Sequence, residues 1–71
     1  METSRDLVGR NVAALRKEAG YSQEELAFRA DVHRTEVSLI ERGKRDPRLG
    51  TLVKLSRALD VAPAILISGV S

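Results

Sequence analysis

The chain has 71 residues, with 12 Lys and Arg against 10 Asp and Glu, one His and no Cys. The lack of cysteine excludes disulfides and thiolate zinc sites, and the sequence offers no catalytic set of nucleophile, base and orienting residue. We therefore expect one domain over residues 1–71, with its core between residues 5 and 67, that is not an enzyme and holds no metal, cofactor or small-molecule ligand. No apolar run approaches the roughly 20 residues that cross a bilayer, so we expect a cytoplasmic protein without a membrane partner.

Two helices are predicted in the first half of the chain. Apolar residues recur at the spacing of one helix face at Val8, Val12, Leu15 and Ala19. They predict a helix from about residue 4 to 19, which Gly20 is placed to end. Ser22, followed three residues later by Glu25, has the pattern of a capping box, in which each side chain accepts a backbone N–H. This box predicts a second helix over roughly residues 23–30.

A third helix is predicted after a tight turn at residues 31–33. Val37 and Ile40 mark its buried side, and Gly43 closes it after Arg42. Two short helices joined by such a turn, with a polar face left exposed on the second, form the arrangement that places a recognition helix in the major groove of DNA.

The remainder of the chain is predicted to form a loop and two helices. Residues 43–50 are predicted to form a basic loop, because Pro47 lacks a backbone N–H and biases Asp46 away from helical geometry. The fourth helix has an inward face of Leu52, Val53, Ser56 and Leu59. Pro63 suits the first turn of a last helix that carries Ala64, Ile65, Leu66 and Ile67. The expected fold class is therefore all-α, with five helices.

The outer face of the third helix carries the candidate base-reading residues. With Val37 and Ile40 turned inward, the helical step of about 100° per residue leaves five residues on or near that face. These are His33, Arg34, Thr35, Ser38 and Leu39. A guanidinium can pair with guanine O6 and N7, and a leucine suits the methyl group of thymine. Leu39 could equally be the edge of the core, and His33 occupies a cap position without being a good cap.

Residues that suit the DNA backbone flank this helix. The basic ones follow it directly and are Arg42, Lys44, Arg45 and Arg48. Their position favours phosphate contacts over an ordinary solvated charge run, and such contacts add affinity without specificity. Ser22 and Gln23 stand at the start of the second helix, where free N–H groups favour a phosphate. Capping alone is the alternative for these two residues.

Several segments resemble the phage Cro and repressor type of helix-turn-helix regulators. They are residues 15–17 (LRK), 20–27 (GYSQEELA) and 37–43 (VSLIERG), and Pro47 with Leu52, within a resemblance that runs from about residue 7 to 66. The resemblance implies a compact, lambda-repressor-like domain with the helix-turn-helix at its second and third helices. It also implies that Gln23 contacts DNA and that Arg16 lies near a phosphate.

The resemblance further implies an internal ion pair. In the family a basic residue matching Arg16 pairs with an acid matching Glu41, and both are present here. The chain also departs from the family pattern. His33 stands where relatives carry Ser, Thr or Asp, so the third helix lacks the usual type of N-capping residue. Polar residues are usual at Gly50 and Ile65, and Ala is frequent at Ser56.

The apolar residue at position 65 suggests an exposed apolar surface near the C-terminus that binds another protein chain. The expected dimer contacts are Ile65, Leu66, Ile67 and Val70. The alternative is a last helix that only covers its own core, but the chain is short and shows no other oligomerisation module. We expect a transcriptional regulator that binds a palindromic operator in double-stranded DNA as a homodimer. The alternative is a protein-binding module, such as an antitoxin or an antagonist of a regulator, that acts through this C-terminal apolar surface.

Overall fold

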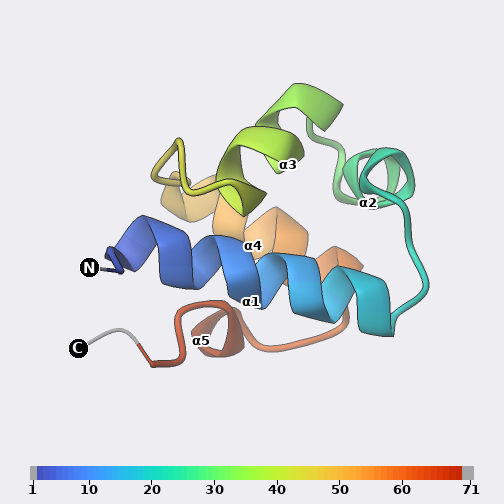
Figure 1. Cartoon of the computed structure of the whole chain (residues 1–71). Coiled ribbons are helices and arrows are strands. Elements are labelled where there is room, and N and C mark those ends of the chain that lie inside the picture. Colours follow the sequence, from blue (N-terminus) through green and yellow to red (C-terminus); the bar gives the residue numbers. More distant parts are fainter. Residues whose placement is uncertain (1, 70–71) are drawn as a thin grey trace.

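The computed structural model describes residues 2–69, which form five helices and no strand (Figure 1). The helices are α1 (Ser4–Glu18), α2 (Gln23–Ala30), α3 (Arg34–Glu41), α4 (Leu49–Ala58) and α5 (Pro63–Leu66). The predicted all-α fold with five helices is confirmed. The loop after α3 is shorter than expected, because Arg48 is already the N-cap of α4 and Gly50 lies inside that helix. None of the helices within residues 2–69 could span a lipid bilayer.

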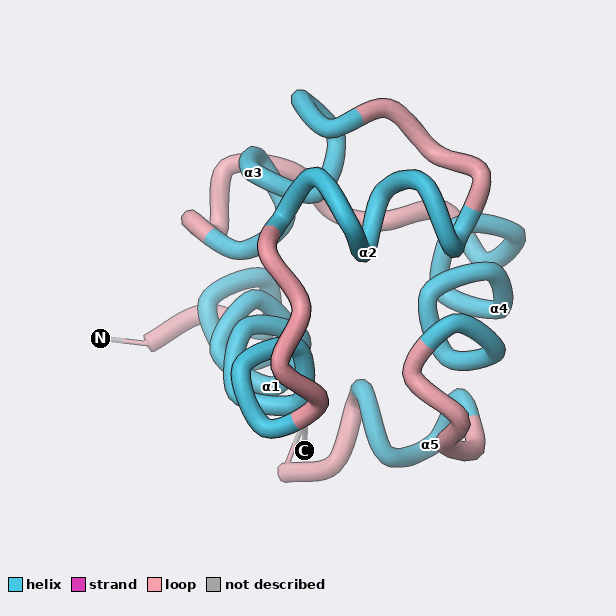
Figure 2. Tube along the Cα trace, turned by 90° about the vertical axis from the view of Figure 1, so that its right-hand side faces the viewer, coloured by secondary structure: helices cyan, strands magenta, loops and turns pink. Residues whose placement is uncertain are grey.

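The helices surround a common core, as the view along α1 shows (Figure 2). α3 packs against α1 and α2, α4 packs against α2, and α5 lies against α1 and α4. The buried apolar residues are Val8, Val12, Leu26, Ala27, Ala30, Val37, Ile40, Leu55, Leu59 and Leu66. Leu55 is fully buried although the predicted inward face of the fourth helix did not include it. Ser56 is also buried, and its hydroxyl donates to the Val53 carbonyl at 2.8 Å, which satisfies this polar group inside the core.

The turns on either side of α2 and α3 depend on left-handed backbone conformations. Gly20 ends α1 at φ 80° and Gly43 follows α3 at φ 70°, as the sequence predicted. Asp31 adopts φ 57° in the turn between α2 and α3. A left-handed residue turns the chain sharply after a helix and satisfies its last carbonyl groups. Left-handed residues therefore stand before α2, between α2 and α3, and after α3.

The helix starts differ from the sequence prediction in one respect. The Ser22 hydroxyl accepts the Glu25 N–H at 3.0 Å, but the Glu25 carboxylate is taken by Arg29 at 2.8 Å, so the predicted capping box is only half formed. A complete box lies instead at α1, between Thr3 and Asp6. Hydrogen bonds from Thr3 lower the pKa of the Asp6 carboxyl below its ordinary value.

α1 holds two other parts of the chain on different faces. A Cβ atom at Gly9 would lie 2.8 Å from the Glu41 carbonyl oxygen and closer still to that of Ile40, so only glycine permits this approach to α3. The side-chain amide of Asn11 donates to the carbonyl oxygens of Leu66 and Ser68, both at 3.0 Å. Residues 9 and 11 point to different sides of a helix. α1 thus fixes α3 and the C-terminal segment relative to each other.

Candidate nucleic-acid interface

The outer side of α3 is polar and exposed. Val37 and Ile40 are fully buried, as predicted, and set the direction of this side. His33, Arg34 and Thr35 are exposed, whereas Ser38 and Leu39 are half-buried. His33 is the N-cap of α3, and its side chain makes no capping hydrogen bond. The structure therefore brings the five predicted base-reading residues together, and their contacts to bases stay a prediction.

A shallow groove lies between the start of α2 and this outer side of α3. Its volume is about 190 Å³, and it is lined by Gln23, Arg34, Thr35 and Ser38. The lining offers a guanidinium, two hydroxyls and an amide, which are the groups that hydrogen-bond to base edges and phosphates. The groove joins a residue expected to contact the DNA backbone with three expected to read bases.

A buried ion pair lies behind α3. Arg16 donates from Nε to Glu41 Oε2 at 2.6 Å and from Nη2 to Oε1 at 3.0 Å, and the two side chains are only 12% and 6% exposed. This bidentate geometry is the strong form of the interaction. The hydrogen bonds to Glu41 raise the pKa of Arg16 above its already high ordinary value. The pair that the family resemblance implied is thus confirmed.

Arg16 has a third internal partner, because its Nη1 donates to the Tyr21 carbonyl oxygen at 2.9 Å. Tyr21 directly precedes Ser22, the N-cap of α2. One guanidinium on α1 therefore binds both the end of α3 and the chain entering α2. The expected contact of Arg16 with a phosphate stays a prediction.

Gln23 joins the same network. Its Nε2 donates to Glu41 Oε1 at 3.0 Å, so a single carboxylate binds side chains from α1 and α2. The sequence did not predict this contact. Gln23 and Glu41 are 18 residues apart, and no local pattern links residues at that separation.

The loop between α3 and α4 forms a basic surface. All four of its predicted phosphate-binding residues are exposed: Arg42, Lys44, Arg45 and Arg48. Arg45 differs from the others because Glu36 on α3 holds its Nη1 at 2.6 Å. This pair ties the loop to α3 and offsets the charge of Arg45. The pair also borders a wider, open depression of about 450 Å³ that includes Arg48 and Thr51.

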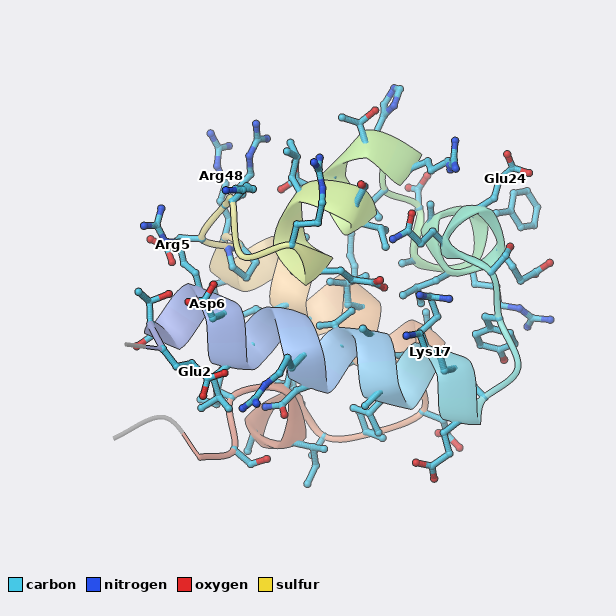
Figure 3. The ribbon with its side chains drawn as sticks, viewed as in Figure 1. Glu2, Arg5, Asp6, Lys17, Glu24 and Arg48 are labelled. Atoms are coloured by element: carbon cyan, nitrogen blue, oxygen red, sulfur yellow. The ribbon has the colours of Figure 1, made fainter. Side chains whose placement is uncertain are left out.

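The basic surface extends to the start of α1, which the sequence did not reveal. Arg5 and Arg48 lie at the same end of the molecule (Figure 3). Arg5 Nε is 4.0 Å from Asp46 Oδ1 in the loop, and the two side chains are 46% and 78% exposed. The two segments are about 40 positions apart in the sequence, so only the fold brings them together.

α5 lies on the opposite side of α1 from α3 (Figure 1). Ile65 and Ile67 are each 45% exposed there. Leu66, by contrast, is fully buried in the core and has no surface to offer a partner, so its assignment as a dimer contact is wrong. Val70 lies outside the described residues. The described C-terminal apolar patch consists of Ile65 and Ile67.

Comparisons with known proteins agree with this architecture. The helix-turn-helix family HTH_3 matches residues 12–66. The chain is 45% identical to the control protein C.BamHI of Bacillus amyloliquefaciens over 62 residues, which cover 86% of this chain and 76% of that protein.

Two solved structures are closely similar in fold. One is the restriction-modification controller protein C.AhdI from Aeromonas hydrophila, with a TM-score of 0.85, 39% identity and coverage of 87% of this chain and 94% of that chain. The other is SinR, a master regulator for biofilm formation, in complex with DNA, with a TM-score of 0.83, 39% identity and coverage of 86% and 98%. As the sequence resemblance indicated, the chain belongs to the HTH_3 family of helix-turn-helix proteins.

Proposed function

We propose that the protein is a cytoplasmic transcriptional regulator that binds a palindromic operator in double-stranded DNA as a homodimer. The observation that carries the proposal is the outer side of α3, where five residues suited to base reading lie together beside a basic loop. The DNA complex of the similar protein SinR supports a DNA ligand. A two-fold dimer would place its two α3 helices in successive major grooves, about 34–36 Å apart.

Selection of bound sites from random duplex DNA tests the whole proposal. We expect enrichment of an inverted repeat whose half-sites are separated by about one helical turn, 10–10.5 base pairs. This result would establish DNA binding, two-fold symmetry and half-site spacing in one experiment. Recovery of no enriched sequence at low salt would contradict the proposed function.

Arg34→Ala is expected to relax base preference at one position of each half-site. The lost guanidinium contact would reduce discrimination there by about 1–3 kcal/mol, because a bidentate pair to guanine is worth that much. Affinities for the operator and its single-base-pair variants measure this effect. Arg10→Ala is the matched control, since Arg10 lies on α1 rather than α3 and pairs with Glu2, just before that helix. Unchanged preference at every position would remove Arg34 from the base-reading set.

Lys44→Ala is expected to weaken binding to all sequences. It should also make the negative slope of log affinity against log salt shallower by about 0.9, the value for one phosphate contact. Arg45→Ala is expected to change the slope by less than about half as much, because Glu36 already offsets the charge of Arg45. Titrations of one operator at several salt concentrations compare the two. Equal slopes for both variants would show that Glu36 releases Arg45 on binding.

Ile65→Asp is expected to convert a dimer into a monomer and to reduce operator affinity. A carboxylate on the small patch of Ile65 and Ile67 would have to be desolvated against the partner copy. Sedimentation equilibrium reports the mass, and circular dichroism verifies that the monomer stays folded. A wild-type chain that is monomeric and binds no duplex would favour the alternative, a protein-binding module that uses this same patch.

A further inference from the structure

The segment that carries Ile65 and Ile67 needs support from the rest of the chain. α5 has only four residues, and a helix this short is not stable by itself. The last carbonyl groups of a helix have no partner within it and need donors from elsewhere. The Ile65 carbonyl has a local donor, because the Ser68 hydroxyl donates to it at 2.9 Å. The carbonyls of Leu66 and Ser68 are instead bound by a side chain on α1.

That side chain is Asn11. Its Nδ2 donates to the Leu66 carbonyl oxygen and to the Ser68 carbonyl oxygen, in both cases at 3.0 Å. An asparagine amide carries two N–H donors, so these two bonds use its full donor capacity. Aspartate has nearly the same size but no donor when it is ionised. The match between donors and carbonyls is therefore specific to the amide at position 11.

The two bonds hold the backbone between the exposed isoleucines. Ile65 and Ile67 are each 45% exposed, whereas Leu66 between them in the sequence is fully buried. The side chain of Leu66 packs in the core, and its carbonyl is bound by Asn11. The middle residue of the patch is thus held at both its side chain and its backbone. The directions in which Ile65 and Ile67 leave the backbone are fixed as a result.

A second contact joins the same segment to α1. Gly69 adopts φ 92°, a conformation that suits glycine. A Cβ atom at Gly69 would lie 3.2 Å from Leu7 Cδ2, so the chain passes close to α1 there. The C-terminal segment is therefore attached to α1 before Ile67, through the Leu66 carbonyl, and after it, through Ser68 and Gly69.

We propose that Asn11 is a positioning residue for self-association, which orders the patch of Ile65 and Ile67 before a second copy binds. A surface that is already ordered loses less conformational freedom on association, so the complex is more stable. Asn11 acts through the backbone of the C-terminal segment. The inference rests on the proposed function, because it concerns how the proposed dimer surface is held.

The test measures the dimer dissociation constant of the full chain and its variants by sedimentation equilibrium. Asn11→Ala removes both donors, and Asn11→Asp replaces them with a carboxylate that repels the two carbonyl oxygens. Lys17→Ala is the matched control on α1, because residue 17 is exposed and lies about 240° around the helix from residue 11. Circular dichroism at the same temperature verifies that each variant is folded, so the constants compare folded molecules.

Gly69→Ala tests the same inference without changing α1. Alanine is strained at φ 92°, and its methyl group would press on Leu7. Residue 69 is exposed and lies outside the helices, so this variant loosens the segment while the core stays intact. It keeps the inference testable if a substitution at Asn11 prevents folding.

We expect Asn11→Ala and Gly69→Ala each to raise the dimer dissociation constant by about threefold to tenfold, the effect of ordering one or two side chains on association. Asn11→Asp raises the constant further, and Lys17→Ala leaves it unchanged. Operator binding by the Asn11 variants weakens at low protein concentration. It recovers at concentrations above their dimer dissociation constants, because the dimer is then restored by mass action.

The outcomes separate this inference from the proposed function. If the wild-type chain dimerises and the folded variants at positions 11 and 69 keep its dissociation constant, the inference is overturned and the proposed homodimer stands. Lower melting temperatures with an unchanged constant would give Asn11 a purely structural role and also overturn it. If the wild-type chain is a monomer at all concentrations, the proposed homodimer fails and the inference fails with it. A dimer that Ile65→Asp leaves intact would use another surface and would overturn the inference as well.

Discussion

Arg16→Ala is expected to lower the free energy of unfolding by about 3–5 kcal/mol, the usual cost of breaking a buried ion pair from one side. The substitution leaves Glu41 as a carboxylate that is only 6% exposed and has lost its counter-charge. It also removes the donor to the Tyr21 carbonyl, just before α2. In a domain of this size each kcal/mol corresponds to a change of about 4–8 °C in Tm. Urea and thermal unfolding would measure the loss.

Arg10→Ala is the control for the Arg16 variant. Arg10 pairs with Glu2 at 2.9 Å, at a similar distance, but both of these side chains are well exposed. Exposed pairs contribute about 0–1 kcal/mol, because water and salt screen the charges. If Arg16→Ala lost no more stability than Arg10→Ala, the buried pair would have no special weight in this fold.

Gly9→Ala is expected to destabilise the protein by about 1–3 kcal/mol, the range for overpacking a filled site. Alanine is the better helix former by about 1 kcal/mol, so propensity alone predicts the opposite sign. The added methyl group would lie too close to the carbonyl oxygens of Ile40 and Glu41, which are backbone atoms and cannot rotate away. α1 and α3 would have to separate. Chemical denaturation of the two proteins side by side measures the difference.

Gly50→Ala supplies the matched comparison. Gly50 also lies within a helix, but a Cβ atom there would meet no other atom within 4 Å. We expect this variant to gain about 0.4–1 kcal/mol, mainly because alanine restricts the unfolded chain. Shifts of the same sign at positions 9 and 50 would argue against the close contact between α1 and α3.

Local patterns carried most of the fold prediction. The helices and the left-handed glycines follow from residues within a few positions of one another. The half-formed capping box shows the limit of this reasoning, since Arg29 competes for the Glu25 carboxylate from one turn further along α2. In α5, which has only four residues, no periodicity could show that Leu66 faces the core while Ile65 faces outward.

One part of the candidate site could be predicted from the sequence, and another part could not. The outer side of α3 could be predicted because two buried residues determine where every other residue of a helix points. The link from Gln23 to Glu41 and the approach of Arg5 to Asp46 could not. They join residues from different helices and loops, and their geometry exists only after the chain has folded.

α1 has a consequence for the proposed dimer. It touches α3 at Gly9 and Arg16, and it holds the C-terminal segment through Asn11. α1 is a single helix of 15 residues. It therefore fixes the distance between the surface that would meet the second copy and the surface that would meet DNA. In the proposed dimer, α1 would then help to set the distance between the two half-sites that the protein accepts. Substitutions that bend or tilt α1 would alter the preferred distance between half-sites without touching a residue that contacts DNA.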